Sequence, residues 1–126
     1  MIVGFGMDLC PVERGEEMLK KPHFMERVFT EDEREYIVSR GVGAAQSAAG
    51  LYAAKEAVLK ALGTGIGYEG TGLLQVEIGH SAYGAPQVTL SGAAQERLFR
   101  IGGTRVHLTL THDGGMAAAA AIAEGE

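Results

Sequence analysis

The chain has one cysteine, few basic residues and no long apolar segment, and each shortage excludes a class of protein. Because Cys10 has no second cysteine to pair with, no internal disulfide can form, and we expect a reducing, cytoplasmic setting. Sixteen acidic residues outnumber eleven basic ones, which argues against broad nucleic-acid binding. No segment reaches the roughly 18 apolar residues of a membrane span, and the alanine-rich residues 116–123 are too short and too weakly hydrophobic to cross. We therefore expect neither nucleic acid nor a membrane as a partner.

The sequence also lacks an internal repeat, an interdomain linker and a basic N-terminal leader of the kind that signal peptides carry. At 126 residues the chain can bury one core, so we expect a single domain over residues 1–126.

Hydrophobic periodicity and turn residues predict a mixture of strands and helices. Thr30 and Glu33 form a capping box that starts a helix ending near Ser39, and Gly63 closes a long helix as its C′ residue. The alanine-rich tail is ambiguous, but the tight turn before it favours a hairpin strand. Residues 24–29 are expected to form a turn. The predicted strands cover residues 2–9, 74–78, 86–90, 105–111 and 116–123, and the predicted helices cover 11–20, 31–39, 45–62 and 92–101.

Asp8, Glu56 and Lys60 form the most informative constellation. Asp8 ends an apolar strand whose Gly4 and Gly6 share its face, leaving room there for a ligand or another backbone. Glu56 and Lys60 lie one helical turn apart, so a carboxylate and a cation point the same way. Two carboxylates are oxygen donors that hold Mg²⁺ while leaving positions for substrate phosphates.

Each of these residues also has a plainer interpretation. Asp8 could cap the following helix, and Glu56 with Lys60 could be an ordinary stabilising pair on a helix surface. Lys55 could extend along the surface with its charge in water. From the residues alone, these readings are at least as good as the functional ones.

The remaining motifs argue against a Walker-type phosphate-binding loop, a zinc site and a catalytic cysteine. Residues 63–67 follow a helix C-terminus, where the macrodipole disfavours anions, and they lack the spacing of a Walker phosphate-binding loop. None of the four histidines has zinc-ligand spacing, although His112 stands at a strand end beside an acid. We assign Cys10 to packing, because no group in the sequence evidently activates it.

Taken together, five blocks in order resemble the small 4′-phosphopantetheinyl transferases of the holo-[acyl-carrier-protein] synthase family. The blocks are Gly4–Leu9, Phe24–Glu33, Ala53–Ala61, Gly63–Gly65 and Val106–Asp113. Any one of them alone would be weak, but five in the right order over nearly the whole length are specific.

The resemblance implies an α+β fold in which an antiparallel sheet packs against a long central helix. It implies transfer of 4′-phosphopantetheine from coenzyme A, the co-substrate, to a serine of apo acyl carrier protein, with release of adenosine 3′,5′-bisphosphate. It also implies a homotrimer with active sites between subunits, working in lipid synthesis such as fatty acid biosynthesis. The sequence does not distinguish a fatty-acid carrier protein from a polyketide one.

The same resemblance implies roles for individual residues. Asp8 and Glu56 match the Mg²⁺ ligands, and these two with Lys60 form the implied catalytic set. Arg14 and Arg27 match basic positions that meet the carrier protein. The implied coenzyme A contacts are Lys60, Gly63, Thr64, Gly65 and His112.

This chain departs from the family pattern at two positions. Leu51 stands where the family usually has an arginine, which removes a cation that could contact the nucleotide end of coenzyme A. Ala85 replaces a frequent lysine in a Gly-Lys-Pro turn. The first departure keeps a second hypothesis open, namely an inactive family member that binds a carrier protein or a nucleotide.

Overall fold

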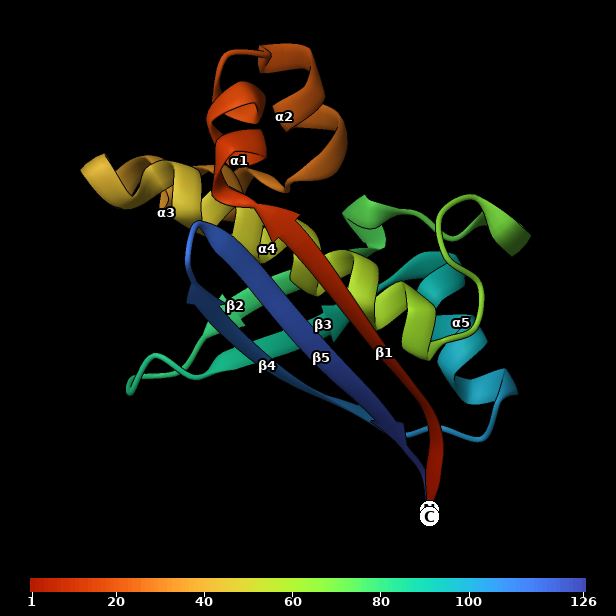
Figure 1. Cartoon of the computed structure of the whole chain (residues 1–126). Coiled ribbons are helices and arrows are strands. Elements are labelled where there is room, and N and C mark those ends of the chain that lie inside the picture. Colours follow the sequence, from red (N-terminus) through yellow and green to blue (C-terminus); the bar gives the residue numbers. More distant parts are fainter.

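In the computed structural model, which describes residues 1–126, one long helix lies against a three-stranded antiparallel sheet (Figure 1). On its other sides this helix, α4, contacts α1 most extensively, and it also contacts α3 and the strand β2 of a two-stranded hairpin formed by β2 and β3. The strands are β1 (Ile2–Pro11), β2 (Val76–His80), β3 (Pro86–Leu90), β4 (Arg105–Asp113) and β5 (Met116–Glu124). The helices are α1 (Val12–Leu19), α2 (Pro22–Val28), α3 (Glu31–Ser39), α4 (Ala44–Ala61) and α5 (Gly92–Arg100), with 3₁₀ turns η1 (Gly41–Gly43), η2 (Tyr68–Gly70) and η3 (Leu73–Gln75). The predicted α+β architecture is confirmed.

The larger sheet has the strand order β1-β5-β4, so the N-terminal and C-terminal strands pair with each other. The two chain ends consequently meet, and the Met1 amino group donates a hydrogen bond of 2.7 Å to the Gly125 carbonyl. The alanine-rich segment is the central strand, as the hairpin argument predicted. Its alternate alanines are buried against α4, and their small side chains let the helix approach the sheet closely.

The glycines of β1 make room for the backbone of α4 rather than for a ligand. A Cβ at Gly6 would lie 2.6 Å from Lys60 Cβ and 2.7 Å from the Ala61 nitrogen, and one at Gly4 would collide with the Ala61 carbonyl. Strand and helix are therefore packed at the closest possible distance. This packing fixes Asp8, two residues beyond Gly6, relative to the second half of α4.

Some local predictions are confirmed and others are wrong. The capping box is present, since Thr30 Oγ1 accepts from the Glu33 nitrogen and the Glu33 carboxylate accepts from the Thr30 nitrogen. The predicted turn at residues 24–29 is instead the end of helix α2, which Pro22 opens and which packs Met25 and Val28 inward. Residues 74–75 belong to η3 rather than to a strand. Ser91 occupies the N-cap position of α5, but its side chain makes no capping hydrogen bond.

The surface reading of Lys55 is also wrong. Its side chain is completely buried and forms an ion pair with Glu33, which is itself buried. The second Glu33 oxygen accepts a hydrogen bond of 2.8 Å from the Ile78 nitrogen. One carboxylate thus joins the start of α3, the middle of α4 and strand β2.

The outer face of the larger sheet is apolar along β1 and remains uncovered. Phe5, Met7 and Leu9 are 74%, 64% and 61% exposed, and Ile122 on the neighbouring strand lies opposite Phe5. Exposed apolar side chains gathered on one flat surface are typical of an interaction surface. None of the helices combines the length and the apolar character that crossing a bilayer requires.

Candidate active site

Asp8 and Lys60 meet where β1 crosses the second half of α4. Lys60 Nζ donates to Asp8 Oδ1 at 2.9 Å and to the Met7 carbonyl at 3.1 Å. The Asp8 side chain is 15% exposed and that of Lys60 is 50% exposed, so the pair lies at the rim of the packed interface. The hydrogen bond to Asp8 raises the pKa of Lys60, which therefore keeps its proton at neutral pH.

Glu56 lies one turn before Lys60 on the same side of α4 and is half-buried. Burial is the largest cause that raises the pKa of the Cys10 thiol; Arg14 opposes it, and the Asp8 and Glu56 carboxylates both add to it. Both carboxylates therefore lie within electrostatic reach of one thiol. Glu56 forms no ion pair, whereas Asp8 is paired with Lys60.

Tyr52 lies one helical turn before Glu56 on α4, and Arg14 contacts Tyr52. The Arg14 guanidinium lies 4.8 Å from the centre of the Tyr52 ring, and its Nη2 donates to the tyrosine hydroxyl at 3.4 Å. Burial raises the pKa of Tyr52, and the nearby Glu56 carboxylate raises it further, so the phenol stays neutral. Arg14, on α1, is thereby held beside the carboxylate pair.

The loop after α4 borders the same region. A pocket of about 210 Å³ is lined by Glu56, Leu59, Lys60, Gly65 and Ile66. Gly63 has a φ of 80° and donates to the Lys60 carbonyl at 2.9 Å, which confirms it as the C′ residue of the helix. Thr64 is buried, and its Oγ1 has no hydrogen-bond partner. Of the loop residues assigned to coenzyme A, Gly65 is the one that lines this pocket.

Arg97 binds the backbone at the start of this loop, a contact that the sequence did not predict. From α5, its Nε donates to the Leu62 carbonyl at 2.9 Å, at the negative end of the α4 macrodipole. Nothing in the local sequence signals this contact, because the two residues belong to separate helices.

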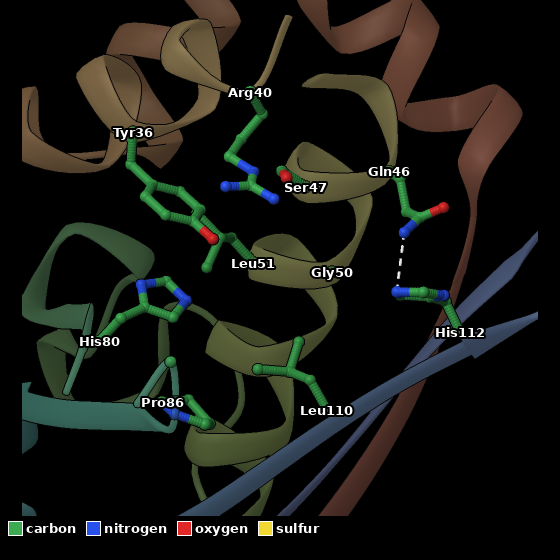
Figure 2. A pocket seen from close by; sticks show the side chains of 11 residues that line it. Tyr36, Arg40, Gln46, Ser47, Gly50, Leu51, His80, Pro86, Leu110 and His112 are labelled. Carbon is green, nitrogen blue, oxygen red and sulfur yellow. Dashed lines mark hydrogen bonds between the residues drawn. The ribbon is translucent and has the colours of Figure 1, made fainter. Parts of the chain in front are cut away.

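His112 does not join the Asp8–Lys60 cluster within one chain. It lies on β4, at the opposite edge of the larger sheet from β1, and contacts the Gln46 side-chain nitrogen at 2.7 Å (Figure 2). It lines a second pocket of about 260 Å³, formed by α3, the first half of α4, the β2–β3 turn and β4. Leu51 also lines this pocket, whereas Asp8, Glu56 and Lys60 do not. The predicted site residues thus form two groups on two sides of α4.

Comparisons with known proteins agree over nearly the whole chain. A family model described as the 4′-phosphopantetheinyl transferase superfamily matches residues 4–121. A holo-[acyl-carrier-protein] synthase of Treponema denticola is 42% identical over 125 residues, which are 99% of this chain and 100% of that protein.

Two solved structures are similar in fold as well as in sequence. The holo-[acyl-carrier-protein] synthase of Neisseria meningitidis has a TM-score of 0.87 at 31% identity, with 98% of this chain and 99% of that chain covered. The Bacillus anthracis synthase, solved in complex with CoA (3′,5′-ADP), has a TM-score of 0.82 at 37% identity, with 100% and 99% covered. On the family match, the full-length identity and the shared fold, the chain belongs to the 4′-phosphopantetheinyl transferase superfamily and, within it, to the holo-[acyl-carrier-protein] synthases.

Proposed function

We propose that residues 1–126 act as one transferase domain, which moves 4′-phosphopantetheine from coenzyme A to a serine of an apo acyl carrier protein and releases adenosine 3′,5′-bisphosphate. The observation that carries the proposal is the contact of Asp8 with Lys60 beside Glu56, bordered by a pocket, in a chain that matches holo-[acyl-carrier-protein] synthases along its length. The coenzyme A complex of the Bacillus anthracis relative supports the choice of donor.

Asp8 and Glu56 are the residues that would hold Mg²⁺. Both are hard oxygen donors at the same crossing of β1 and α4, because Glu56 lies one helical turn before Lys60, which is hydrogen-bonded to Asp8, and Glu56 forms no ion pair. No group of three or more histidine, cysteine, aspartate and glutamate side chains comes together in the structure. Two carboxylates suit Mg²⁺, which keeps waters and takes substrate phosphates as its other ligands. When bound there, the ion would stabilise negative charge on the transferred and departing phosphates.

Lys60 would supply fixed positive charge beside the reacting phosphate. As an ammonium group that donates to Asp8, it is not the base that accepts the serine proton. Asp8 is engaged by Lys60, which leaves Glu56, acting through a water, as the protein group positioned for that step. A preorganised ammonium costs no rearrangement as charge develops, which is the main source of catalysis in phosphoryl transfer.

Arg14 and Arg27 would orient the acidic carrier protein. Both are exposed on neighbouring helices, α1 and α2, and Arg14 is held by Tyr52 one turn from Glu56. A local pair of cations can attract and align an acidic partner although the chain carries a net charge of −5. The carrier serine would then be presented at the carboxylate pair.

The complete site would form between two copies of the chain, in a homotrimer. The support is the separation of His112 and its pocket from the Asp8 cluster, together with the exposed apolar face of β1. A 1:1 co-assembly of inactive Asp8→Asn and His112→Ala chains tests this arrangement. Sites shared between neighbours would recover about one quarter of wild-type activity, since a random mixture pairs intact residues in that fraction of sites. No recovery in a confirmed mixed assembly would contradict a shared site.

The activity itself is tested by mass spectrometry of an apo acyl carrier protein after incubation with coenzyme A and Mg²⁺. We expect Asp8→Asn and Glu56→Gln each to lower the rate at least about 100-fold, the scale of losing one electrostatic contact to a reacting phosphate. Asp32→Asn, an equal change at an exposed position on α3, is the control. An unchanged rate in either site variant would reject the assignment. Carrier-protein binding without any turnover by the wild type would instead support the inactive binding module, which the named relatives do not favour.

A further inference from the structure

Helices α1 and α2 carry acids and bases in equal number. Residues 12–28, which span both helices at one end of the molecule, contain four acidic side chains and four lysines or arginines, all of them exposed (Figure 1). The bases include Arg14 and Arg27, the cations that the proposed function assigns to the carrier protein. The surface has no net positive charge, so it cannot attract an acidic partner by its total charge alone.

Three of these charges form a stripe of alternating sign along α1. Arg14, Glu17 and Lys20 are spaced by three residues, which places them on neighbouring turns of the exposed side of the helix. The stripe begins next to the candidate active site, because the Arg14 guanidinium contacts Tyr52. Lys20 Nζ lies 3.7 Å from Glu17 Oε1, and these two side chains are 72% and 58% exposed. From the site outward the charges are thus positive, negative and positive.

The stability of α1 does not account for the acid in the middle of this stripe. Glu17 stands in the last turn of the helix, where the negative end of the macrodipole disfavours a carboxylate. Its one ion pair is the exposed contact with Lys20, and exposed pairs of this kind contribute little to stability. A carboxylate that weakens its own helix end and is loosely paired remains available for a contact outside the chain.

On the basis of the proposed function, we propose that Glu17 selects among carrier proteins by binding a basic residue that lies between two acids on the carrier surface near the reactive serine. Arg14 and Lys20 would bind the two acids. A carrier with acids at all three positions would bring a carboxylate against Glu17, and like charges placed together at an interface are costly. Glu17 is thus a specificity residue, which disfavours uniformly acidic carriers as well as attracting the matched one.

The test measures kcat/KM for transfer from coenzyme A, with the full assembled protein and Mg²⁺, to a uniformly acidic apo acyl carrier protein and to variants of that carrier. Each carrier variant has one surface acid near the reactive serine changed to lysine. Glu17→Lys should raise kcat/KM on the uniformly acidic carrier about threefold to tenfold at low salt, through KM rather than kcat, as expected for a charge changed at the rim of an interface. On at least one lysine carrier the order should reverse, with the wild type the faster enzyme.

A matched control and a salt series separate this contact from a general effect of charge. Glu96→Lys makes the same change at an exposed position on α5, the helix whose Arg97 contacts the C-terminal end of α4, and it should alter kcat/KM for any of these carriers by less than about twofold. Between about 0.05 and 0.5 M salt, the activity of Glu17→Lys on the acidic carrier should fall steeply. The activity of the wild type should vary less, because the charges of its stripe compensate one another.

Thermal denaturation of each variant verifies folding, which the exposure of Glu17 favours. An unchanged kcat/KM in Glu17→Lys on the acidic carrier, or a gain with no reversal on any lysine carrier, would overturn the role of Glu17 while the transferase proposal stands. Transfer to none of the carriers by the wild type would overturn the proposed function, and this inference with it.

Discussion

Gly6→Ala tests the close packing on which the site geometry depends. The added Cβ would lie 2.6 Å from Lys60 Cβ and 2.7 Å from the Ala61 nitrogen, against an ordinary contact of about 3.4 Å or more. The Ala61 nitrogen is helix backbone and cannot rotate away, so β1 and α4 must separate by several tenths of an ångström. Overpacking of this kind costs about 1–3 kcal/mol. The conformational gain from replacing a strand glycine returns only about 0.5–1 kcal/mol.

We therefore expect a net loss of about 1 kcal/mol in the free energy of unfolding, which corresponds to a fall in Tm of roughly 4 °C for a domain of this size. The transfer rate should fall further than the loss of folded protein alone explains. Asp8 follows Gly6 on β1 whereas Glu56 and Lys60 belong to α4, so separating β1 from α4 moves Asp8 away from the other two residues. The measurements are thermal denaturation at fixed protein concentration and the carrier-protein mass assay well below both Tm values.

Gly79→Ala is the matched control, since a Cβ there would meet nothing within 4 Å. It should raise Tm by a few degrees, the gain of about 0.5–1 kcal/mol from replacing a strand glycine without a clash, and leave the rate close to that of the wild type. A Gly6→Ala protein with an unchanged Tm would refute the packing argument. One with a lowered Tm and an unchanged rate would refute the link between this packing and the site.

Two further changes probe features away from β1. Lys55→Met should lower the free energy of unfolding by about 3–5 kcal/mol, because it leaves the buried Glu33 carboxylate without its partner; a double-mutant cycle with Glu33→Gln measures the coupling, and a value near zero would contradict the ion pair. Hydrogen bonds from His107 and then Arg105 lower the pKa of Glu124 from 4.5 to about 2. Because this pKa is lower in the folded state, the stabilisation is present above pH 4.5 and is lost as the pH falls toward 2. Acid titration of Glu124→Gln should show a shallower loss of stability in that range, and an unchanged slope would contradict this assignment.

Features that depend on neighbours a few residues away could be predicted from the sequence. The period-two alternation of residues 105–111, the Thr30–Glu33 capping box and the C′ role of Gly63 all involve short-range geometry, and the structure confirms each. The family resemblance came from such local blocks as well. Helix α2 was missed because seven residues form a marginal helix alone, and this one is stabilised by burying Met25 and Val28.

The burial of polar residues, and their grouping into a site, depend on contacts between distant segments and could not be predicted from local patterns. Lys55 looked like a surface lysine, and its burial depends on Glu33, 22 residues away and on another helix. The pocket beside His112 gave no signal, because it exists only where α3, α4 and β4 meet. A charge acquires its role from what surrounds it, and those surroundings are assembled by packing between distant segments. Local sequence patterns do not contain that information.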